Sequence, residues 1–295
     1  MSRAAVVANP ARQPDRGKFQ GTVRAAMSRH GWEEPLWLET TEADPGGGVA
    51  AAAVAARVDL VLASGGDGTV TACAGAVAGS GIPLAVLPSG TGNLLARNLR
   101  LPIDLDRALA VALTGTDRQL DVGCANGLPF LVMAGVGFDA RALSGSRPLK
   151  PRLGWAAYYV AALAHLRDQP MQVSLQVDGL PPSRRLASAV VIGNVGALPG
   201  GVALLPDARP DDGLLDVVLL TAHGLASWMA VGAQLLLRRR AGGRVARMTF
   251  RELRIDLDRE QPWQLDGESM GGTRELLITV APGTLLLRGP GAGTM

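Results

Sequence analysis

The stretch "SGGDGTV" at residues 64–70 directly follows the apolar run "VDLVLA" at residues 58–63. It places three glycines around one aspartate where a strand ends, although glycine loses more conformational freedom on folding than any other residue. In an open α/β sheet, ligands bind beyond the carboxyl ends of the strands, where a glycine-rich turn lets backbone N–H groups approach an anion. The stretch therefore indicates a phosphate-binding turn, in which Gly65, Gly66 and Gly68 remove the Cβ atoms that would block a phosphate.

The aspartate of this turn, Asp67, leaves two interpretations open. A carboxylate repels phosphate oxygens unless a cation lies between them, so a nucleotide here predicts Mg²⁺ nearby. The alternative is a tight strand-to-helix turn in which Asp67 merely caps a helix that begins near Thr69. The residues "GGDG" alone do not decide between the two.

The next predicted strand ends in a similar loop, within "LPSGTGNLLARNL" at residues 87–99. Gly90 and Gly92 lie on either side of Thr91. Asn93 then stands where a helix would be capped. The arrangement at residues 64–70 is thus repeated one strand later.

The first predicted strand also ends in a small polar loop, "ANP" at residues 8–10, which contains Asn9 and Pro10. Three strands thus each deliver a polar loop to one edge of the sheet, which favours a nucleotide cleft over three unrelated turns. Neither the GxxxxGK[ST] pattern nor GxGxxG occurs, so an ordinary P-loop or dinucleotide-binding fold is excluded.

Strands and helices alternate through the first half of the chain. Short apolar runs that end in turn residues, as buried parallel strands do, occupy residues 3–9, 35–40, 58–64 and 83–89. Helix-compatible segments lie at residues 19–31, 49–57 and 69–79. This order predicts βαβ units and an α/β domain with a doubly wound, mostly parallel sheet.

From about residue 125 the pattern changes to strands that follow one another. The strand candidates are residues 128–138, 171–179, 186–195, 214–222, 247–258, 275–281 and 284–289, and two segments, 153–166 and 224–240, look helical. We therefore expect a nucleotide-binding α/β domain at residues 1–123, which the C-terminal segment 283–295 can complete. A mainly antiparallel, β-rich substrate domain is expected at residues 124–282.

Composition excludes several classes of protein. The 29 basic and 26 acidic residues leave a formal net charge of +3, so charge gives no case for a nucleic-acid partner. Three histidines and two cysteines are too few for a disulfide framework or a His/Cys metal site, which favours the reducing cytoplasm. The N-terminus resembles neither a signal peptide nor an anchor, so contact with lipid would be peripheral.

The chain resembles the diacylglycerol kinase catalytic domain family, which includes soluble bacterial lipid kinases and is related to sphingosine and ceramide kinases. The matching segments occur in the family's order: "NP" at 9–10, "TTEADPG" at 40–46, "GGDGTV" at 65–70, "LPSGTGNLLAR" at 87–97, "DVG" at 121–123, "LLPDARPDDGLLDV" at 204–217 and "DGE" at 266–268. "GGDGT" is shared with NAD kinases and 6-phosphofructokinases, whereas the last two segments belong to the lipid-kinase branch. The resemblance implies an NAD kinase-like α/β domain followed by a β-sandwich.

The resemblance also implies roles for individual residues. The positions similar to the family's nucleotide contacts are Asn9, Pro10, Thr41, Gly65, Gly66, Asp67, Gly68, Thr69, Gly90, Thr91, Gly92, Asn93 and Glu268. Asp266 matches the general base that accepts the proton of the lipid hydroxyl. Asp67 and Asp121 resemble members of an acidic, water-linked network around catalytic Mg²⁺.

A second, structural magnesium is implied in "RPDDGLLDV", held by the carboxylate of Asp212 with the carbonyl groups of Arg209 and Leu214. The chain departs from the family at one point: many relatives have Asn-Asp-Phe-Ala-Arg where this chain has "NLLAR" at residues 93–97. The acidic residue of that motif is therefore missing, with Leu94 in its place. This puts in doubt any role assigned to that acid, and with it the identity of the lipid.

Taken without the resemblance, two of these segments have simpler interpretations. Asp266 follows the strand candidate "PWQL" and, with Gly267, would form an ordinary hairpin turn. "PDDG" would likewise be a turn before a strand. With the family match, the general-base interpretation of Asp266 is preferred over the ordinary hairpin turn.

Peripheral membrane contact is suggested by residues 226–247, which combine an apolar helical run, Trp228 and five arginines. The alternative is a core-packed helix with a solvated basic end. Trp155, Tyr158 and Tyr159 have the same two interpretations.

Together these features predict a cytoplasmic, magnesium-dependent lipid kinase that moves the γ-phosphate of ATP to a diacylglycerol-like or long-chain acceptor. A homodimer is compatible with this prediction. One alternative is an NAD kinase-like enzyme, which would share the "GGDGT" loop. The other is a catalytically inactive, nucleotide-gated lipid-binding protein.

Overall fold

The computed structural model describes residues 2–137, 170–196, 204–222, 227 and 245–291. The chain divides into two compact units, one formed by Met1–Val122 with Pro282–Met295 and the other by Gly123–Ala281. Each unit has a hydrophobic core of its own. The chain passes between them within two strands, β5 (Thr116–Ala125) and β14 (Glu268–Gly289).

The first unit contains a parallel sheet. Its strand order is β14-β4-β3-β1-β2, and every pair in it is parallel. The four N-terminal strands are β1 (Ala4–Ala8), β2 (Leu36–Glu39), β3 (Leu60–Gly65) and β4 (Leu84–Pro88). β1, β2 and β4 lie within apolar runs that the sequence predicted as strands, and β3 extends one residue beyond its run, to Gly65. Both faces of β1 and β3 are buried, as parallel sheets require.

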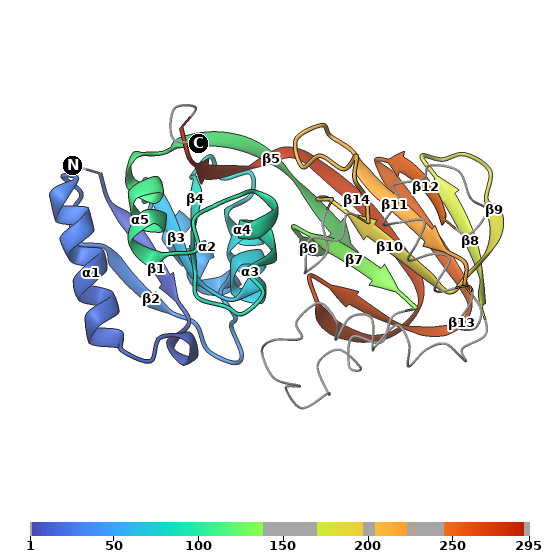
Figure 1. The fold of residues 1–295 in the computed structure, drawn as a ribbon, viewed down its shortest axis with the longest axis horizontal. Coiled ribbons are helices and arrows are strands. Elements are labelled where there is room, and N and C mark those ends of the chain that lie inside the picture. Colours follow the sequence, from blue (N-terminus) through green and yellow to red (C-terminus); the bar gives the residue numbers. More distant parts are fainter. Residues whose placement is uncertain (1, 138–169, 197–203, 223–226, 228–244, 292–295) are drawn as a thin grey trace. The chain divides into compact units, whose positions relative to one another are not determined.

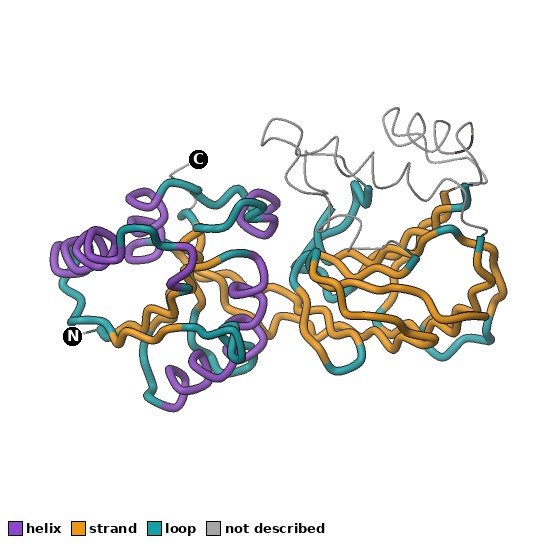
Figure 2. Tube along the Cα trace, turned by 90° about the horizontal axis from the view of Figure 1, so that it is seen from below, coloured by secondary structure: helices purple, strands orange, loops and turns teal. Residues whose placement is uncertain are grey.

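Helices cover both faces of this sheet (Figures 1 and 2). They are α1 (Arg16–Arg29), α2 (Gly47–Ala55), α3 (Asp67–Val77) and α5 (Leu105–Thr114), with the short η1 (Pro10–Arg12) and α4 (Leu94–Asn98) between them. Apolar side chains of α1 and α5 share one core with Leu60 and Leu62 of β3. Because successive strand residues point to opposite faces, Val61 and Ala63 are buried on the other face. The predicted doubly wound α/β fold is confirmed.

The second unit is antiparallel. The order β12-β11-β10-β7-β13-β14 forms its main path, and β8 and β9 extend it from β13. The strands are β6 (Leu128–Phe130), β7 (Met133–Val136), β8 (Met171–Val177), β9 (Ser183–Ala187), β10 (Ala189–Gly193), β11 (Leu215–Leu220), β12 (Val245–Phe250) and β13 (Glu252–Leu265).

Strand β13 folds this unit into a β-sandwich because it changes partners along its length. Its first part, Leu253–Leu257, pairs with β8, and its last part, Trp263–Leu265, pairs with β7. Register shifts interrupt its pairing with β14 between Asp256 and Gln264. Such irregularities bend a strand, so one strand contributes to both layers around a shared apolar core.

Several element boundaries differ from the predicted ones. The candidate at residues 247–258 is two strands, β12 and the start of β13, and the candidates at 275–281 and 284–289 form the single strand β14. β5 and α5 were not predicted. The predicted helices at residues 153–166 and 224–240 fall outside the described residues, apart from Ser227.

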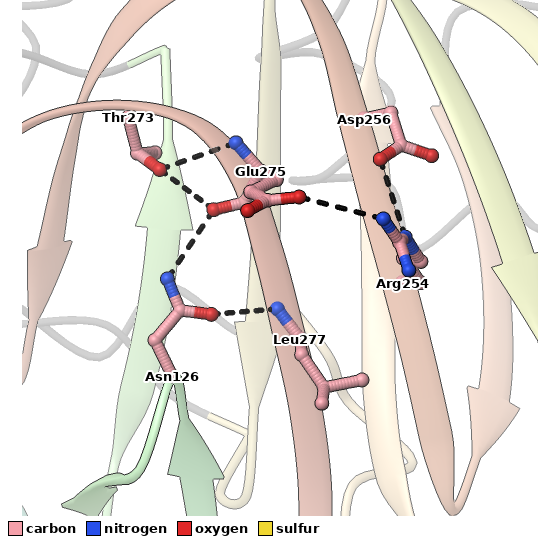
Figure 3. A network of polar contacts seen from close by, with 6 residues as sticks. All are labelled: Asn126, Arg254, Asp256, Thr273, Glu275 and Leu277. Carbon is pink, nitrogen blue, oxygen red and sulfur yellow. Dashed lines mark hydrogen bonds and ion pairs between the residues drawn. The ribbon is translucent and has the colours of Figure 1, made fainter.

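A polar network ties the β5–β6 turn to the surface of β14 (Figure 3). Asn126, which has a φ of 49°, accepts the N–H of Leu277 at 2.8 Å and donates to the carbonyl of Glu275 at 3.3 Å. Arg254 forms ion pairs with Asp256 at 3.3 Å and Glu275 at 3.4 Å. These side chains are exposed, so the pairs contribute little to stability and the network mainly fixes the turn.

Candidate active site

Three loops meet at the carboxyl edge of the parallel sheet in the first unit. They follow β1, β3 and β4, which are neighbours in the order β4-β3-β1. The N–H of Asn9 donates to the carbonyl of Ser64 at 2.8 Å, and the N–H of Ser89 donates to the carbonyl of Gly65 at 3.1 Å. Backbone hydrogen bonds therefore join each outer loop to the central glycine loop.

The loop after β1 is held by side chains as well. Asn9 caps η1, because its side-chain oxygen accepts the N–H of Ala11 at 3.0 Å, and Pro10 is the first residue of that short helix. Gln13 donates to the hydroxyl of the buried Ser64 at 3.1 Å. Asn9 and Pro10 thus lie at the sheet edge beside the central loop.

Thr41 lies in the loop after β2, which prepares the start of α2. Its hydroxyl accepts the N–H of Asp44 at 3.0 Å. Asp44 in turn accepts the N–H groups of Gly46 and Gly48 at 3.0 Å and of Val49 at 2.9 Å. The pKa of Asp44 is lowered, chiefly by the hydrogen bond from Gly46, so the start of α2 is capped by an ionised carboxylate.

The glycines of the two main loops make room for each other. A Cβ at Gly90 would lie 2.7 Å from the Cα of Gly66, and a Cβ at Gly65 would lie 2.4 Å from the Cβ of Thr69. None of these three glycines has a positive φ. At Gly65 and Gly90 close packing therefore requires glycine, a reason that the sequence argument about phosphate access did not include.

Close packing does not require glycine at position 66, although Gly66 lies in the same loop as Gly65. A Cβ there would meet only the Cα of Gly90, at the ordinary contact distance of 3.9 Å. Gly66 is also the N-cap residue of α3, and it provides no side chain to cap the first N–H groups of that helix. The protein's own packing gives no reason for glycine at this position.

Asp67 caps a helix, but not the one expected. Helix α3 begins at Asp67 itself, and the carboxylate of Asp67 accepts the N–H of Leu94, the first residue of α4, at 2.5 Å. A Cβ at Gly92 would lie 2.6 Å from the second carboxylate oxygen of Asp67. Burial raises the pKa of Asp67, while N–H groups of Leu94, Asn93 and its own backbone oppose that shift. Asp67 thus joins the loop after β3 to the loop after β4.

Asn93 holds the loop after β4 in shape. It has a φ of 48° and occupies the N-cap position of α4, but its side chain makes no capping bond. Instead the side chain accepts the N–H of Gly90 and donates to the carbonyl of Gly90, both at 3.0 Å. The prediction that the Asn93 side chain caps a helix is wrong, because Asp67 provides the carboxylate for α4. Thr91 is exposed at the tip of this loop.

Asp121 lies in the part of β5 that belongs to the first unit. It is buried, and its carboxylate accepts the N–H of Gly283 at 2.7 Å. Gly283 has a φ of 60° and lies in the part of β14 that joins the same unit. Asp121 therefore fixes the C-terminal segment to the rest of the first unit.

Asp266 lies in the second unit, in the turn between β13 and β14. Its φ of 46° and the φ of 91° at Gly267 are typical of the two-residue hairpin turn called type I′. The side chain is buried, and its carboxylate accepts three N–H groups, from Leu131 at 2.9 Å, Val132 at 2.9 Å and Met133 at 2.8 Å. The hairpin interpretation is therefore correct for the backbone, and the carboxylate also organises the approach to β7. Glu268 follows as the exposed first residue of β14.

The segment that contains Arg209, Asp212 and Leu214 forms an acidic turn before β11. Asp212 accepts the N–H of Leu214 at 3.1 Å. Burial and the charges of Asp212 and Asp207 raise the pKa of the nearby Asp216 to about 6. In the described part of the chain, no group of three or more His, Cys, Asp or Glu side chains could hold a metal. A magnesium here would depend on carbonyl groups and water as well as carboxylate.

One residue beside the glycine loops escaped the sequence analysis. Arg97 of α4 donates its Nε–H to the carbonyl of Gly92 at 2.9 Å. Arg97 is part of "LPSGTGNLLAR" but was assigned no role, although a cation five residues after Gly92 could have indicated a contact with this loop.

The segments considered for membrane contact, with Trp155, Tyr158, Tyr159 and Trp228, lie outside the described residues. None of the helices in the described ranges is long and apolar enough to cross a membrane.

Two family models match the chain. The diacylglycerol kinase catalytic domain matches residues 3–125, and the YegS C-terminal NAD kinase beta sandwich-like domain matches residues 132–288. A Pseudomonas aeruginosa protein named "Probable lipid kinase YegS-like" is 34% identical over 294 residues, covering 93% of this chain and 92% of the relative.

Two further similarities agree with these matches. A diacylglycerol kinase from Mycobacterium tuberculosis is 35% identical over 176 residues, which cover 57% of this chain and 57% of that relative, so the match spans little more than half of its length. The crystal structure of a diacylglycerol kinase from Bacillus anthracis aligns with a TM-score of 0.78 over 98% of this chain and 96% of that one, at 23% identity, and supports the fold. The chain therefore belongs to the diacylglycerol kinase catalytic domain family, in its branch of YegS-like lipid kinases.

Proposed function

We propose that this protein is an ATP-dependent lipid kinase, which transfers the γ-phosphate of ATP to the hydroxyl group of a diacylglycerol-like or long-chain lipid. Membership of the family supports a kinase. The three loops at the edge of the parallel sheet support a nucleotide site, because open α/β sheets bind ligands at this edge.

The observation that carries the proposal is the start of α3. Asp15, Asp44 and Asp104 accept N–H groups at the starts of α1, α2 and α5, whereas the start of α3 has no side-chain cap. At this start the chain has Gly66, whose missing side chain its own packing does not require. An anion that approaches the free N–H groups would need that space, and the positive end of the helix dipole favours a phosphate.

In the proposed reaction the lipid hydroxyl oxygen forms a bond to the γ-phosphorus, and the bond between that phosphorus and the β–γ bridging oxygen breaks, so that ADP leaves with the electron pair. Asp266 accepts the hydroxyl proton. Three backbone N–H groups hold its carboxylate in a fixed orientation. A positioned base of this kind contributes roughly 10²- to 10⁴-fold to the rate.

Asp67 and Asp121 are proposed to take part in a water-linked network around catalytic magnesium. Each has one carboxylate oxygen bound by a backbone N–H, from Leu94 at 2.5 Å and Gly283 at 2.7 Å. These hydrogen bonds hold both carboxylates in fixed positions, from which each can contact a metal through water. When bound, magnesium would neutralise charge on the phosphate oxygens.

The carboxylate of Asp212, with the carbonyl groups of Arg209 and Leu214, is proposed to hold a structural magnesium. The hydrogen bond from Leu214 to Asp212 brings two of these residues into one turn, and Asp207 and Asp216 add negative charge. Asp212→Ala should therefore lower the melting temperature in magnesium and remove the difference between magnesium and chelator. A wild-type melting curve that chelator does not change would contradict this site.

The proposed activity is tested by incubating purified protein with labelled ATP and Mg²⁺ against separate panels of lipids and NAD. The lipid panel should include diacylglycerol, monoacylglycerol, sphingosine and ceramide in mixed micelles. We expect label in one of these lipids and none with chelator. Label only in NAD would overturn the proposal in favour of an NAD kinase-like enzyme, and ATP binding without label in either panel would favour an inactive lipid-binding protein.

A further inference from the structure

The side chain of Arg97 folds back over the loop that follows β4. Arg97 belongs to the last turn of α4, yet its Nε–H donates to the carbonyl of Gly92 at 2.9 Å, on the N-terminal side of that helix. The side chain is exposed. The hydrogen bond fixes one edge of the guanidinium group and directs the positive charge to the glycine loop.

This charge has no carboxylate partner in the part of the chain that the structure describes. Three other arginines of the first unit are paired: Arg16 with Glu39, Arg24 with Glu34, and Arg288 with Asp117. The ion pairs found among described residues do not include Arg97. The nearby carboxylate of Asp67 is instead bound by the N–H of Leu94.

Leu94 lies three residues before Arg97 in the sequence. Residues at this spacing are neighbours on a helix surface, so an aspartate there could attract the guanidinium group. Leucine at this position is buried and offers no such attraction.

The loop that Arg97 contacts packs against the start of α3. A Cβ at Gly90 would lie 2.7 Å from the Cα of Gly66, and Ser89 donates to the carbonyl of Gly65 at 3.1 Å. The guanidinium group is therefore attached to the loop beside the uncapped helix start. With its Nε–H engaged, the terminal N–H groups remain, and they suit phosphate oxygens in number and geometry.

We propose that Arg97 is a phosphate-binding residue, which donates its terminal N–H groups to the terminal phosphates of the bound nucleotide. The proposal rests on the proposed function, because it takes the nucleotide site at the start of α3 as given. It adds a cation to a site whose other predicted contacts are backbone groups, threonines, two asparagines and carboxylates.

The test compares Arg97→Gln with Arg100→Gln by calorimetric titration of ATP, ADP and adenosine in magnesium. Arg100 is also exposed and lies three residues further on, so the two variants make the same change in net charge. Loss of charged hydrogen bonds should raise the Kd of Arg97→Gln for ATP about tenfold or more. We expect a smaller loss for ADP, no change for adenosine, and wild-type binding by Arg100→Gln.

A structural role of Arg97 would give a different pattern. If Arg97→Gln only distorted the loop, its affinity for adenosine would fall with its affinity for ATP, and Arg97→Lys would restore neither. Equal losses for ATP and adenosine, or equal ATP affinities of Arg97→Gln and Arg100→Gln, would overturn the proposal.

The proposed function can fail independently of this inference. If the wild type binds ATP and Arg97→Gln shows the expected defect, but no lipid is labelled, Arg97 keeps its role and the lipid kinase proposal falls. If a lipid is labelled at equal rates by both variants and the wild type, the lipid kinase proposal stands and the role of Arg97 falls. A wild type that binds no ATP would overturn both.

Discussion

Two aspartate–glycine pairs of this chain, Asp67–Gly68 and Asp266–Gly267, have the same sequence but different backbone conformations. Asp67 starts helix α3, and neither member of its pair has a positive φ. Asp266 and Gly267 both have a positive φ and form the tight turn between β13 and β14. The sequence on either side decides between these structures: a strand followed by a helical pattern in one case, and two strands in the other.

The two aspartates nevertheless have similar structural roles. Each accepts backbone N–H groups from a segment remote in the sequence, 27 residues away for Asp67 and 133 to 135 residues away for Asp266. They differ in their donors: Asp67 accepts the N–H of Leu94 with weaker contributions from the N–H groups of Asn93, Leu95 and its own backbone, whereas Asp266 accepts three consecutive N–H groups. A buried carboxylate with three donors should contribute more to stability than one that caps a short helix.

The largest effect is expected from Asp266→Asn. The amide group would turn a donor toward the N–H of Leu131, so one buried N–H would lose its acceptor. The free energy of unfolding should fall by about 1–3 kcal/mol, together with the loss of most turnover. Denaturant unfolding and the lipid assay measure the two effects separately.

Asp67→Asn is the matched control, because its amide oxygen can still accept the N–H of Leu94. We expect a loss in the free energy of unfolding of less than about 1 kcal/mol. Equal losses of stability in the two variants would contradict the difference between the two carboxylates. Wild-type turnover by Asp266→Asn would exclude Asp266 as the base.

The second effect is a loss of stability when Gly267 or Gly90 is replaced, for a different reason at each position. Gly267→Ala should be destabilised by about 1–2 kcal/mol through strain at a φ of 91°, although the site has open space. Gly267→Asn should be less affected, because asparagine tolerates this region. Gly90→Ala and Gly90→Asn should both be destabilised, since backbone overlap with Gly66 is the obstacle there. Melting temperatures of the four variants check this, and rescue of Gly90 by asparagine would refute it.

The smallest effect involves Asp44, a half-buried aspartate that caps α2. Its pKa in the folded protein is lowered, so its contribution to stability is present above the ordinary aspartate pKa of about 3.9 and is lost as the pH falls through the folded value. The difference in melting temperature between the wild type and Asp44→Ala should therefore shrink below about pH 4. A difference that stays constant from pH 7 to pH 3 would show that hydrogen bonding to an ionised Asp44 is not the cause.

Much of the first unit could be predicted because its signals are local. Apolar runs and turn residues located β1 to β4, and the shared edge of parallel strands brought Asn9, Gly66 and Thr91 into one region. α5 was not predicted but could have been, since its apolar residues Ala108, Leu109, Ala112 and Leu113 recur at helical spacing and are buried. β14 was divided in two because Pro282 and Gly283 normally end a strand.

The partners of the key carboxylates could not be predicted in the same way. The contact between Asp67 and Leu94 depends on the packing of two loops that are 27 residues apart. The three N–H groups around Asp266 come from residues 131–133, which only the tertiary fold brings to the hairpin. Such bonds leave no periodic pattern in the sequence.

The central claim is that phosphate occupies the space at Gly66, at the start of α3. The most direct measurement is the Kd of Gly66→Ala for ATP, together with its melting temperature. Since a Cβ at this position meets only the Cα of Gly90 at 3.9 Å, we predict an unchanged melting temperature and ATP binding at least about tenfold weaker. A variant with wild-type stability and wild-type ATP affinity would contradict the claim.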